Sequence, residues 1–167
     1  MKITNNSISL AGEFAVLSKL ALYGYDASMT LGHTKHVDIL VSHPKTGKMY
    51  QLEVKTKFGS IGGRPTESYL FGNSSGWVMQ EKHEKIMDKN LFYCFVDMGA
   101  GVHPTKFFIV PSKVVAQYCR AENRLWLRDD RSHKQITMRT FRIGFSKRGY
   151  QIPTPSAKRY ENNWQFK

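Results

Sequence analysis

Two short apolar segments that each carry an acidic residue constrain this chain more than any other feature of its sequence. The first is residues 37–41 (VDILV) and the second is residues 51–55 (QLEVK), and a polar turn at residues 43–48 separates them. This pattern predicts two antiparallel strands joined as a β-hairpin. In that hairpin we expect Asp38 to lie beside Glu53.

The second segment predicts a site for a divalent cation. Side chains alternate along a strand, so we expect Gln51, Glu53 and Lys55 on one face and the apolar residues between them on the other, in the core. Two neighbouring carboxylates beside a lysine form a site suited to Mg²⁺, a hard cation that takes oxygen ligands. We therefore expect Asp38 and Glu53 to hold Mg²⁺ next to Lys55.

The order Asp38, Glu53 and Lys55 resembles the motif of the PD-(D/E)xK nuclease superfamily, which has the restriction-endonuclease-like fold. Val37 stands where many members have proline. Members often carry a glutamate on the helix before the first strand, and Glu13 fits that position. The resemblance covers residues 1 to about 120.

The resemblance implies a fold, an activity and a set of residue roles. The fold is α/β, with an αβββαβ core and a mixed central sheet flanked by helices. The activity is that of a Mg²⁺-dependent nuclease, most often a DNA endonuclease, in which Mn²⁺ substitutes for Mg²⁺. The carboxylates of Asp38 and Glu53 and the backbone carbonyl of Val54 would hold the metal, Lys55 would orient the attacking water, and Glu13 would support them. RNA stays open as a substrate, and a homodimer is common among members.

Hydrophobic periodicity and capping signals predict the remaining elements. A helix is expected from a cap at Ser7 or Ser9 to about Tyr23, and Gly24 ends it. Its inward face is expected to carry four apolar residues: Phe14, Leu17, Leu20 and Ala21. We expect further strands at residues 26–31, 91–96, 107–110 and 136–140, and helices at residues 80–89 and 111–120.

The charge of the chain favours a nucleic acid as partner. Lys and Arg number 25 against 13 acidic residues, a net charge of +12. Phosphates attract such a surface because their neutralisation releases counterions. The residues expected to bind nucleic acid are Gln51, Lys57, Arg64, Lys147, Arg148, Lys158 and Arg159. A basic nucleic-acid-binding protein without catalysis is the alternative to a nuclease.

The C-terminal part of the chain interleaves these cations with aromatic residues. Aromatic rings there can stack on exposed bases, or they can hold the tail onto the domain. We favour the second role for Trp164 and Phe166. We expect one domain, with a nuclease core at residues 1–122 and a basic extension at residues 123–167 packed on it.

Three further features bear on the site and on the location of the protein. The Gly- and Ser-rich residues 58–76 follow Lys55 directly, so they form either a flap over the site or a mobile loop. Cys94 and Cys119 lie in apolar segments and are expected to be buried free thiols in a reducing compartment. The N-terminus is polar, and no apolar run is long enough to span a membrane, so we expect a cytoplasmic protein.

Overall fold

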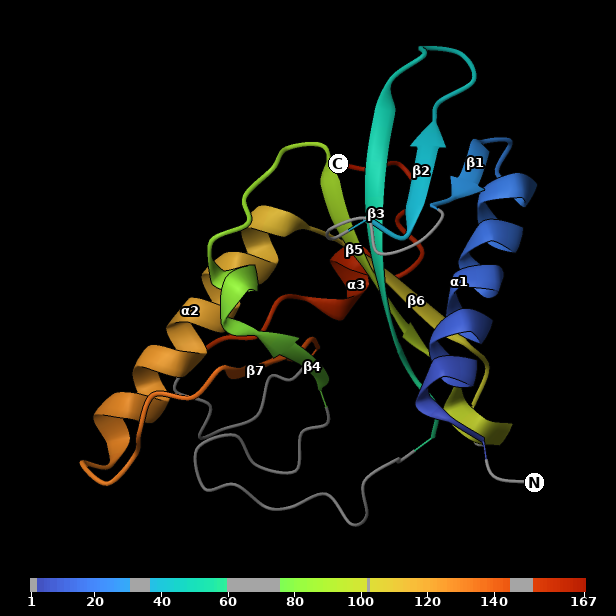
Figure 1. Ribbon diagram of the computed structural model, residues 1–167. Coiled ribbons are helices and arrows are strands. Elements are labelled where there is room, and N and C mark those ends of the chain that lie inside the picture. Colours follow the sequence, from blue (N-terminus) through green and yellow to red (C-terminus); the bar gives the residue numbers. More distant parts are fainter. Residues whose placement is uncertain (1–2, 31–36, 60–75, 102, 145–151) are drawn as a thin grey trace.

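The computed structural model describes residues 3–30, 37–59, 76–101, 103–144 and 152–167 (Figure 1). The helices are α1 (Asn5–Leu22), α2 (Ser112–Asp129) and the short α3 (Ala157–Tyr160), with single turns of 3₁₀ helix at η1 (Glu81–Glu84) and η2 (Gly99–Gly101). The strands are β1 (Asp26–Met29), β2 (Ile39–Ser42), β3 (Met49–Lys57), β4 (Trp77–Gln80), β5 (Leu91–Asp97), β6 (Lys106–Pro111) and β7 (Met138–Phe141).

The central sheet has five strands in the order β1-β2-β3-β5-β6. Strands β3 and β5 run parallel, whereas the other neighbours are antiparallel, so the sheet is mixed as expected. The predicted hairpin is confirmed as β2 and β3, with Ile39 opposite Leu52. Strands β4 and β7 form a separate two-stranded ribbon.

Helix α1 begins earlier than predicted and presents a different face to the sheet. The side chain of Thr4, not of Ser7 or Ser9, caps it by accepting a hydrogen bond from the Ser7 amide at 3.1 Å. A Cβ atom at Gly12 would lie 1.8 Å from Oγ1 of Thr56, so only glycine lets the helix approach β3 this closely. Phe14 is 55% exposed and Ala21 is also exposed, so the prediction that these two residues face the core is wrong, whereas Leu20 is fully buried as predicted.

The segment between β3 and β5 departs from the predicted core order. The expected helix at residues 80–89 is wrong: Gln80 ends β4, and a single 3₁₀ turn follows it. Gln80 pairs with Met138 of β7, a partner far along the chain, so local periodicity did not reveal the ribbon. Helix α2 continues to Asp129, well past the predicted end, and residue 122 lies inside it.

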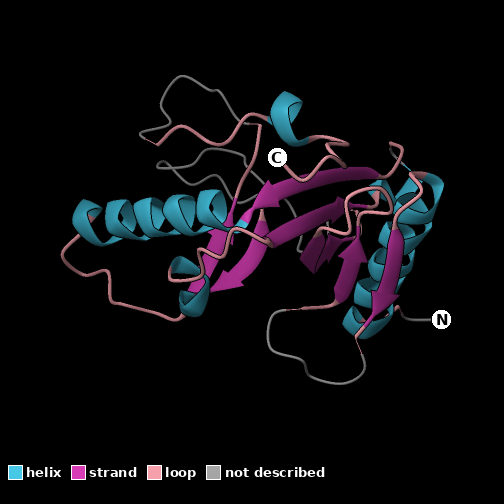
Figure 2. Cartoon of the chain, turned by 90° about the horizontal axis from the view of Figure 1, so that it is seen from above, coloured by secondary structure: helices cyan, strands magenta, loops and turns pink. Residues whose placement is uncertain are grey.

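Two layers cover the two faces of the central sheet (Figure 2). Helix α1 covers one face, and its Val16 and Leu20 pack with Leu52 in an apolar cluster. Helix α2 and the β4–β7 ribbon cover the other face, where Phe95 and Phe141 stack with ring centroids 4.3 Å apart.

The C-terminal residues are part of the α1 side of the core. Trp164 and Phe166 are 3% and 4% exposed and belong to the same cluster as Leu52. The expectation that these two rings hold the tail onto the domain is confirmed. Cys94 and Cys119 are buried and free, also as expected. None of the helices in the described ranges is long and apolar enough to cross a membrane.

Candidate nuclease site

The candidate site is centred on β3, where Glu53 and Lys55 lie on the same face of the strand. The Nζ atom of Lys55 lies 2.6 Å from Oε1 of Glu53. Glu53 is only 4% exposed, although it is charged, whereas the Lys55 side chain is about one-third exposed. A buried carboxylate is stable only when paired, so Glu53 depends on its neighbours.

His83 is the second partner of Glu53, and no motif in the sequence indicates this contact. The buried imidazole comes from η1 and places Nε2 3.2 Å from Oε1 of Glu53. Its Nδ1 lies 2.8 Å from the Gln80 amide nitrogen and 3.0 Å from the Gln80 carbonyl oxygen, so the backbone at the end of β4 holds the ring in place. The sequence pattern predicts a helix here, and a lone histidine in a polar segment carries no recognisable pattern.

The surroundings of Glu53 hold it in the ionised form. Burial raises the pKa of Glu53, but the hydrogen bond from His83 and the charge and hydrogen bond of Lys55 outweigh burial. The pKa is lowered from its ordinary value to about 2. Glu53 is therefore a carboxylate, the form that can bind a cation, throughout the neutral range.

Asp38 reaches the same short stretch of β3 from the residue before β2. Its Oδ2 accepts a hydrogen bond from the backbone amide of Val54 at 2.7 Å, so the carboxylate meets β3 between Glu53 and Lys55. The Asp38 amide donates to the Leu52 carbonyl at 2.8 Å, which extends the pairing of β2 and β3 by one residue.

Glu13 lies within electrostatic range of this group from helix α1. Partial burial and the negative charge of Asp38 raise the pKa of Glu13, while Lys55 opposes them. Asp38, Lys55 and Glu13 thus influence one another, and Lys55 also contacts Glu53.

The donor atoms suit a hard divalent cation in type. Mg²⁺ is commonly held by one or two carboxylates, with water and substrate phosphate completing its shell. Asp38, Glu53 and the Val54 carbonyl offer oxygen donors of that kind. Across the described ranges, however, no three His, Cys, Asp or Glu residues gather closely enough to hold a metal by themselves. A cation here would depend on water or phosphate for the rest of its coordination.

Beside Lys55 a cleft of about 320 Å³ opens between the start of α1, the end of β3 and β4. Lys57 and Trp77 also line it, and the Lys57 ammonium lies 4.3 Å from the centroid of the Trp77 ring. Lys57 is paired with Asp97 at 3.0 Å. Lys55 is thus part of the wall of this cleft.

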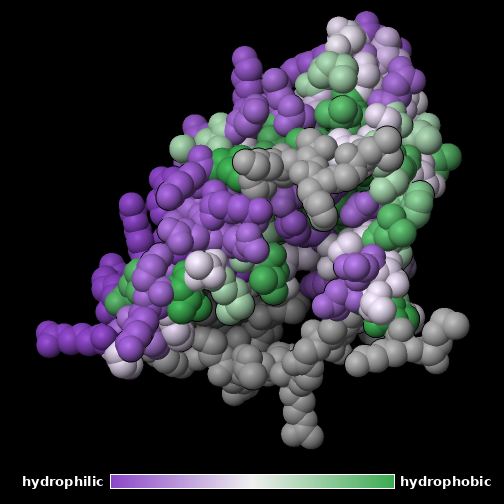
Figure 3. Space-filling model, viewed as in Figure 1, coloured by the Kyte–Doolittle hydropathy of each residue, from purple (hydrophilic) through white to green (hydrophobic). Residues whose placement is uncertain are grey.

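The residues expected to bind nucleic acid are spread over the molecule. Gln51 is half-buried on β3, while Lys158 and Arg159 are exposed on α3, which packs against β6. Arg64, Lys147 and Arg148 lie outside the described residues, as does most of the Gly- and Ser-rich segment. Figure 3 shows hydrophilic residues gathered on the side of the molecule that α2 occupies.

Comparison with known proteins finds a likeness in fold alone. No protein-family model matches the sequence, and no curated protein matches it either. Among solved structures, a bacterial homing endonuclease, I-Ssp6803I, superposes with a TM-score of 0.53 at 10% identity. The match covers 98% of this chain and 91% of that one. The chain therefore shares its mixed α/β fold with an endonuclease, while the PD-(D/E)xK motif has no family match behind it.

Proposed function

We propose that this protein is a Mg²⁺-dependent nuclease that cuts DNA as an endonuclease. The observation that carries the proposal is the meeting of Asp38, Glu53 and Lys55 at one stretch of β3. Lys55 contacts Glu53 at 2.6 Å, and Asp38 accepts from the amide of the residue between them at 2.7 Å. The likeness in fold to a homing endonuclease supports the same reading.

Each residue has a role that its surroundings suit. Mg²⁺, held by Asp38, Glu53 and the Val54 carbonyl, would supply charge stabilisation for the phosphoryl group. Lys55, which is partly exposed and lines the cleft, would orient the attacking water and offset negative charge. His83 is a positioning residue, because it holds the Glu53 carboxylate without reaching the cleft lining.

The substrate class follows from charge. A net charge of +12 suits a polyanion, and an exposed cation pair on α3 adds to the attraction. DNA is the substrate that we propose, with RNA as the second to be tried. Mn²⁺ is expected to replace Mg²⁺, because both cations accept oxygen ligands.

Incubation with supercoiled plasmid tests the proposal. Wild-type protein with Mg²⁺ or Mn²⁺ should nick or linearise the plasmid, EDTA should stop the reaction, and Lys55→Ala should abolish it while DNA binding persists. Lys45→Ala is the control, because it removes an identical charge from the exposed turn between β2 and β3 and should still cut. Equal cutting by wild type and Lys55→Ala would contradict the site.

The alternative is a basic nucleic-acid-binding protein without catalysis. It is favoured by one observation, that the described acidic and histidine residues form no three-residue metal group. In that case the protein would bind DNA equally well in EDTA, Glu53→Ala would bind as wild type does, and no plasmid would be cut at any metal concentration.

A further inference from the structure

The outward face of helix α2 carries all the cationic residues of that helix. A helix turns about 100° per residue, so these cations fall within an arc of about 80° around the axis. Gln117, which is exposed, lies in the same arc. Three of the cations are exposed as well, and Arg120 is half-buried. Together they form the α2 stripe: Lys113, Arg120, Arg124 and Arg128.

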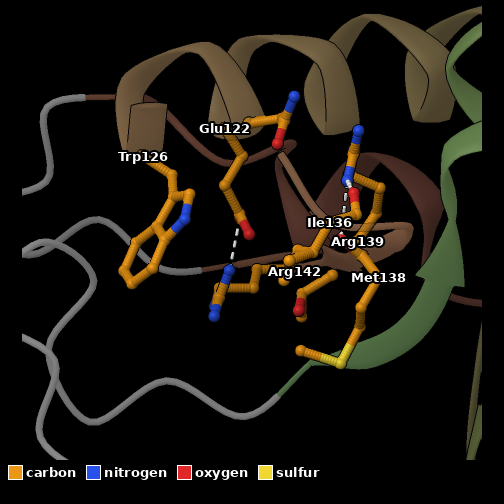
Figure 4. Close-up of a pocket in the computed structure, with 8 residues that line it drawn as sticks. Glu122, Trp126, Ile136, Met138, Arg139 and Arg142 are labelled. Carbon is orange, nitrogen blue, oxygen red and sulfur yellow. Dashed lines mark hydrogen bonds and ion pairs between the residues drawn. The ribbon is translucent and has the colours of Figure 1, made fainter. Parts of the chain in front are cut away.

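The acidic residues of α2 lie on the opposite side of the helix from the stripe. They are Glu122 and Asp129. Glu122 is buried and points from α2 toward Arg142, with which it forms an ion pair (Figure 4). Among the described residues, no carboxylate forms an ion pair with a cation of the stripe. The α2 stripe therefore presents its positive charge to solvent.

The stripe is held on a fixed support. On the inward side of α2, Val115 and Leu125 are buried, so the helix is packed against the domain along its length. Nη2 of Arg120 donates to the Glu84 carbonyl at 2.6 Å, which ties the middle of the stripe to η1. A ligand would therefore meet cations whose backbone positions are already set, and little ordering of the helix would oppose binding.

We propose that the α2 stripe docks on the phosphate backbone of a nucleic-acid duplex. At 1.5 Å per residue, Lys113 and Arg128 lie about 22 Å apart along the axis, and the three arginines follow one another at about 6 Å. Each strand of B-DNA carries a phosphate about every 3.4 Å, so several phosphates can lie along the stripe at once. Evenly spaced cations suit a polymer with evenly spaced charges better than they suit an irregular protein surface. Guanidinium groups also bind phosphate through two hydrogen bonds, and the Gln117 amide can donate to a phosphate oxygen.

The stripe is separate from the candidate nuclease site, although η1 connects the two. Arg120 contacts Glu84, and the adjacent His83 contacts Glu53. No residue of the stripe lines the cleft beside Lys55. Docking at the stripe would therefore contribute to binding and not to the chemistry. That the docked duplex is also the one cut at the site rests on the proposed function, whereas the docking itself does not.

Titration of a labelled DNA duplex in EDTA tests the docking without any cleavage. The stripe variant combines Lys113→Gln, Arg124→Gln and Arg128→Gln; Arg120 is left in place because it also holds the Glu84 carbonyl. Near physiological salt the stripe variant should bind about tenfold more weakly than wild type, and its salt dependence should fall by up to about three phosphate contacts. Two duplexes of unrelated sequence should lose affinity alike, because phosphate contacts carry no sequence information.

Two matched variants control for charge and for folding. The combination of Lys45→Gln, Lys48→Gln and Lys106→Gln removes the same charge from exposed positions outside α2 and should weaken binding less than about threefold. Arg124→Lys with Arg128→Lys keeps the charge of the stripe and should also bind within about threefold of wild type. Helix content from circular dichroism and urea midpoints should match wild type in all three variants, since the substituted side chains are exposed.

The outcomes separate this proposal from its alternatives and from the proposed function. Equal weakening in the stripe variant and in the charge control would overturn docking at α2. Poly-glutamate that displaces the labelled duplex as well as an unlabelled duplex does, at equal charge concentration, would overturn the choice of nucleic acid over an acidic protein. Plasmid cutting with unchanged duplex binding by the stripe variant would overturn the docking alone. Stripe-dependent binding without plasmid cutting would support the docking and count against the nuclease alone.

Discussion

The two sides of the central sheet differ in what they bury. The side under α1 is apolar, with Val16, Leu20 and Leu52 fully buried against one another. The side under η1, the ribbon and α2 buries charged or titratable groups: Glu53, His83, Glu122 and Arg139. Burying such groups is costly unless they are paired, so a side that retains them is the better candidate for function. The comparison separates an apolar layer from a layer that buries the charged residues of the candidate site.

The short turn η1 connects the two polar centres of the second side. His83 contacts Glu53 in the candidate nuclease site, and the next residue, Glu84, pairs with the buried Arg139 of β7. One 3₁₀ turn therefore contacts both of these buried charged residues.

The largest effect is expected from Asp38→Asn, a substitution in the candidate nuclease site. The asparagine keeps an oxygen for the Val54 amide but loses the charge that favours a metal, so cleavage should fall about 10²–10³-fold. The free energy of unfolding should change by less than about 1 kcal/mol. Initial rates of plasmid cleavage measure the first effect, and urea unfolding measures the second. Undiminished cleavage would place the chemistry elsewhere.

A large stability effect is expected from the α1 side. Leu52 is fully buried, so Leu52→Ala should lower the free energy of unfolding by about 2–5 kcal/mol. Lys55→Ala, three residues along the same strand, should lower it by a smaller amount, about 1–2 kcal/mol, because the buried Glu53 loses one partner but keeps His83. Urea unfolding of both variants measures the two losses in free energy of unfolding. Equal losses would erase the distinction between the two layers.

Acid unfolding sharpens the comparison through Glu53. The folded-state pKa of Glu53 is lowered to about 2, so its contribution to stability is complete above its ordinary pKa of 4.5 and is lost as the pH falls toward 2. Glu53→Gln should cost about 1–3 kcal/mol at neutral pH and flatten the acid limb. The urea midpoints of both proteins, measured between pH 3 and 7 in EDTA, test both effects. Glu161→Gln, at an exposed position, is the control and should keep the wild-type acid limb.

The smallest effect is expected at the surface of α3. The double variant Lys158→Ala with Arg159→Ala should weaken DNA binding severalfold and reduce the salt dependence by up to about two charges. Lys45→Ala with Lys48→Ala removes the same charge from the exposed turn between β2 and β3 and is the matched control. Binding titrations at several salt concentrations compare them. An equal loss in both double variants would mean that net charge alone matters.

The features predicted well from the sequence are the local ones. The β2–β3 hairpin, the buried β5 and the end of α1 at Gly24 each depend on alternation, apolar runs or a residue with positive φ, and the structure contains all three. Asp38 was expected beside Glu53 because antiparallel pairing brings opposite residues together. The structure brings Asp38 to the amide of Val54, the residue after Glu53.

The features that were missed depend on partners distant in the sequence. The β4–β7 ribbon pairs Trp77 with Phe141, and no local pattern predicts that pairing. His83 contacts Glu53 from η1, the turn that follows β4 of this ribbon, so its role also depends on that distant pairing. Arg139 likewise alternates with exposed residues, and only its contact with Glu84 shows that it is buried. Tertiary contact, not periodicity, positions these side chains.

The tail that carries Trp164 has a consequence for how copies of this protein behave toward one another. The outermost strand β6 would offer unpaired backbone groups to a neighbouring chain, and such strands recruit further strands and aggregate. Phe108 of β6 instead forms a bridge with Glu161, and the Phe107 carbonyl accepts from the Asn162 amide at 2.8 Å. At the opposite edge of the sheet, β1 has only four residues and offers few backbone groups for pairing with another chain. The C-terminal residues thus cover part of the β6 edge and limit pairing with a second chain. A chain shortened to end before residue 160 would lack this cover.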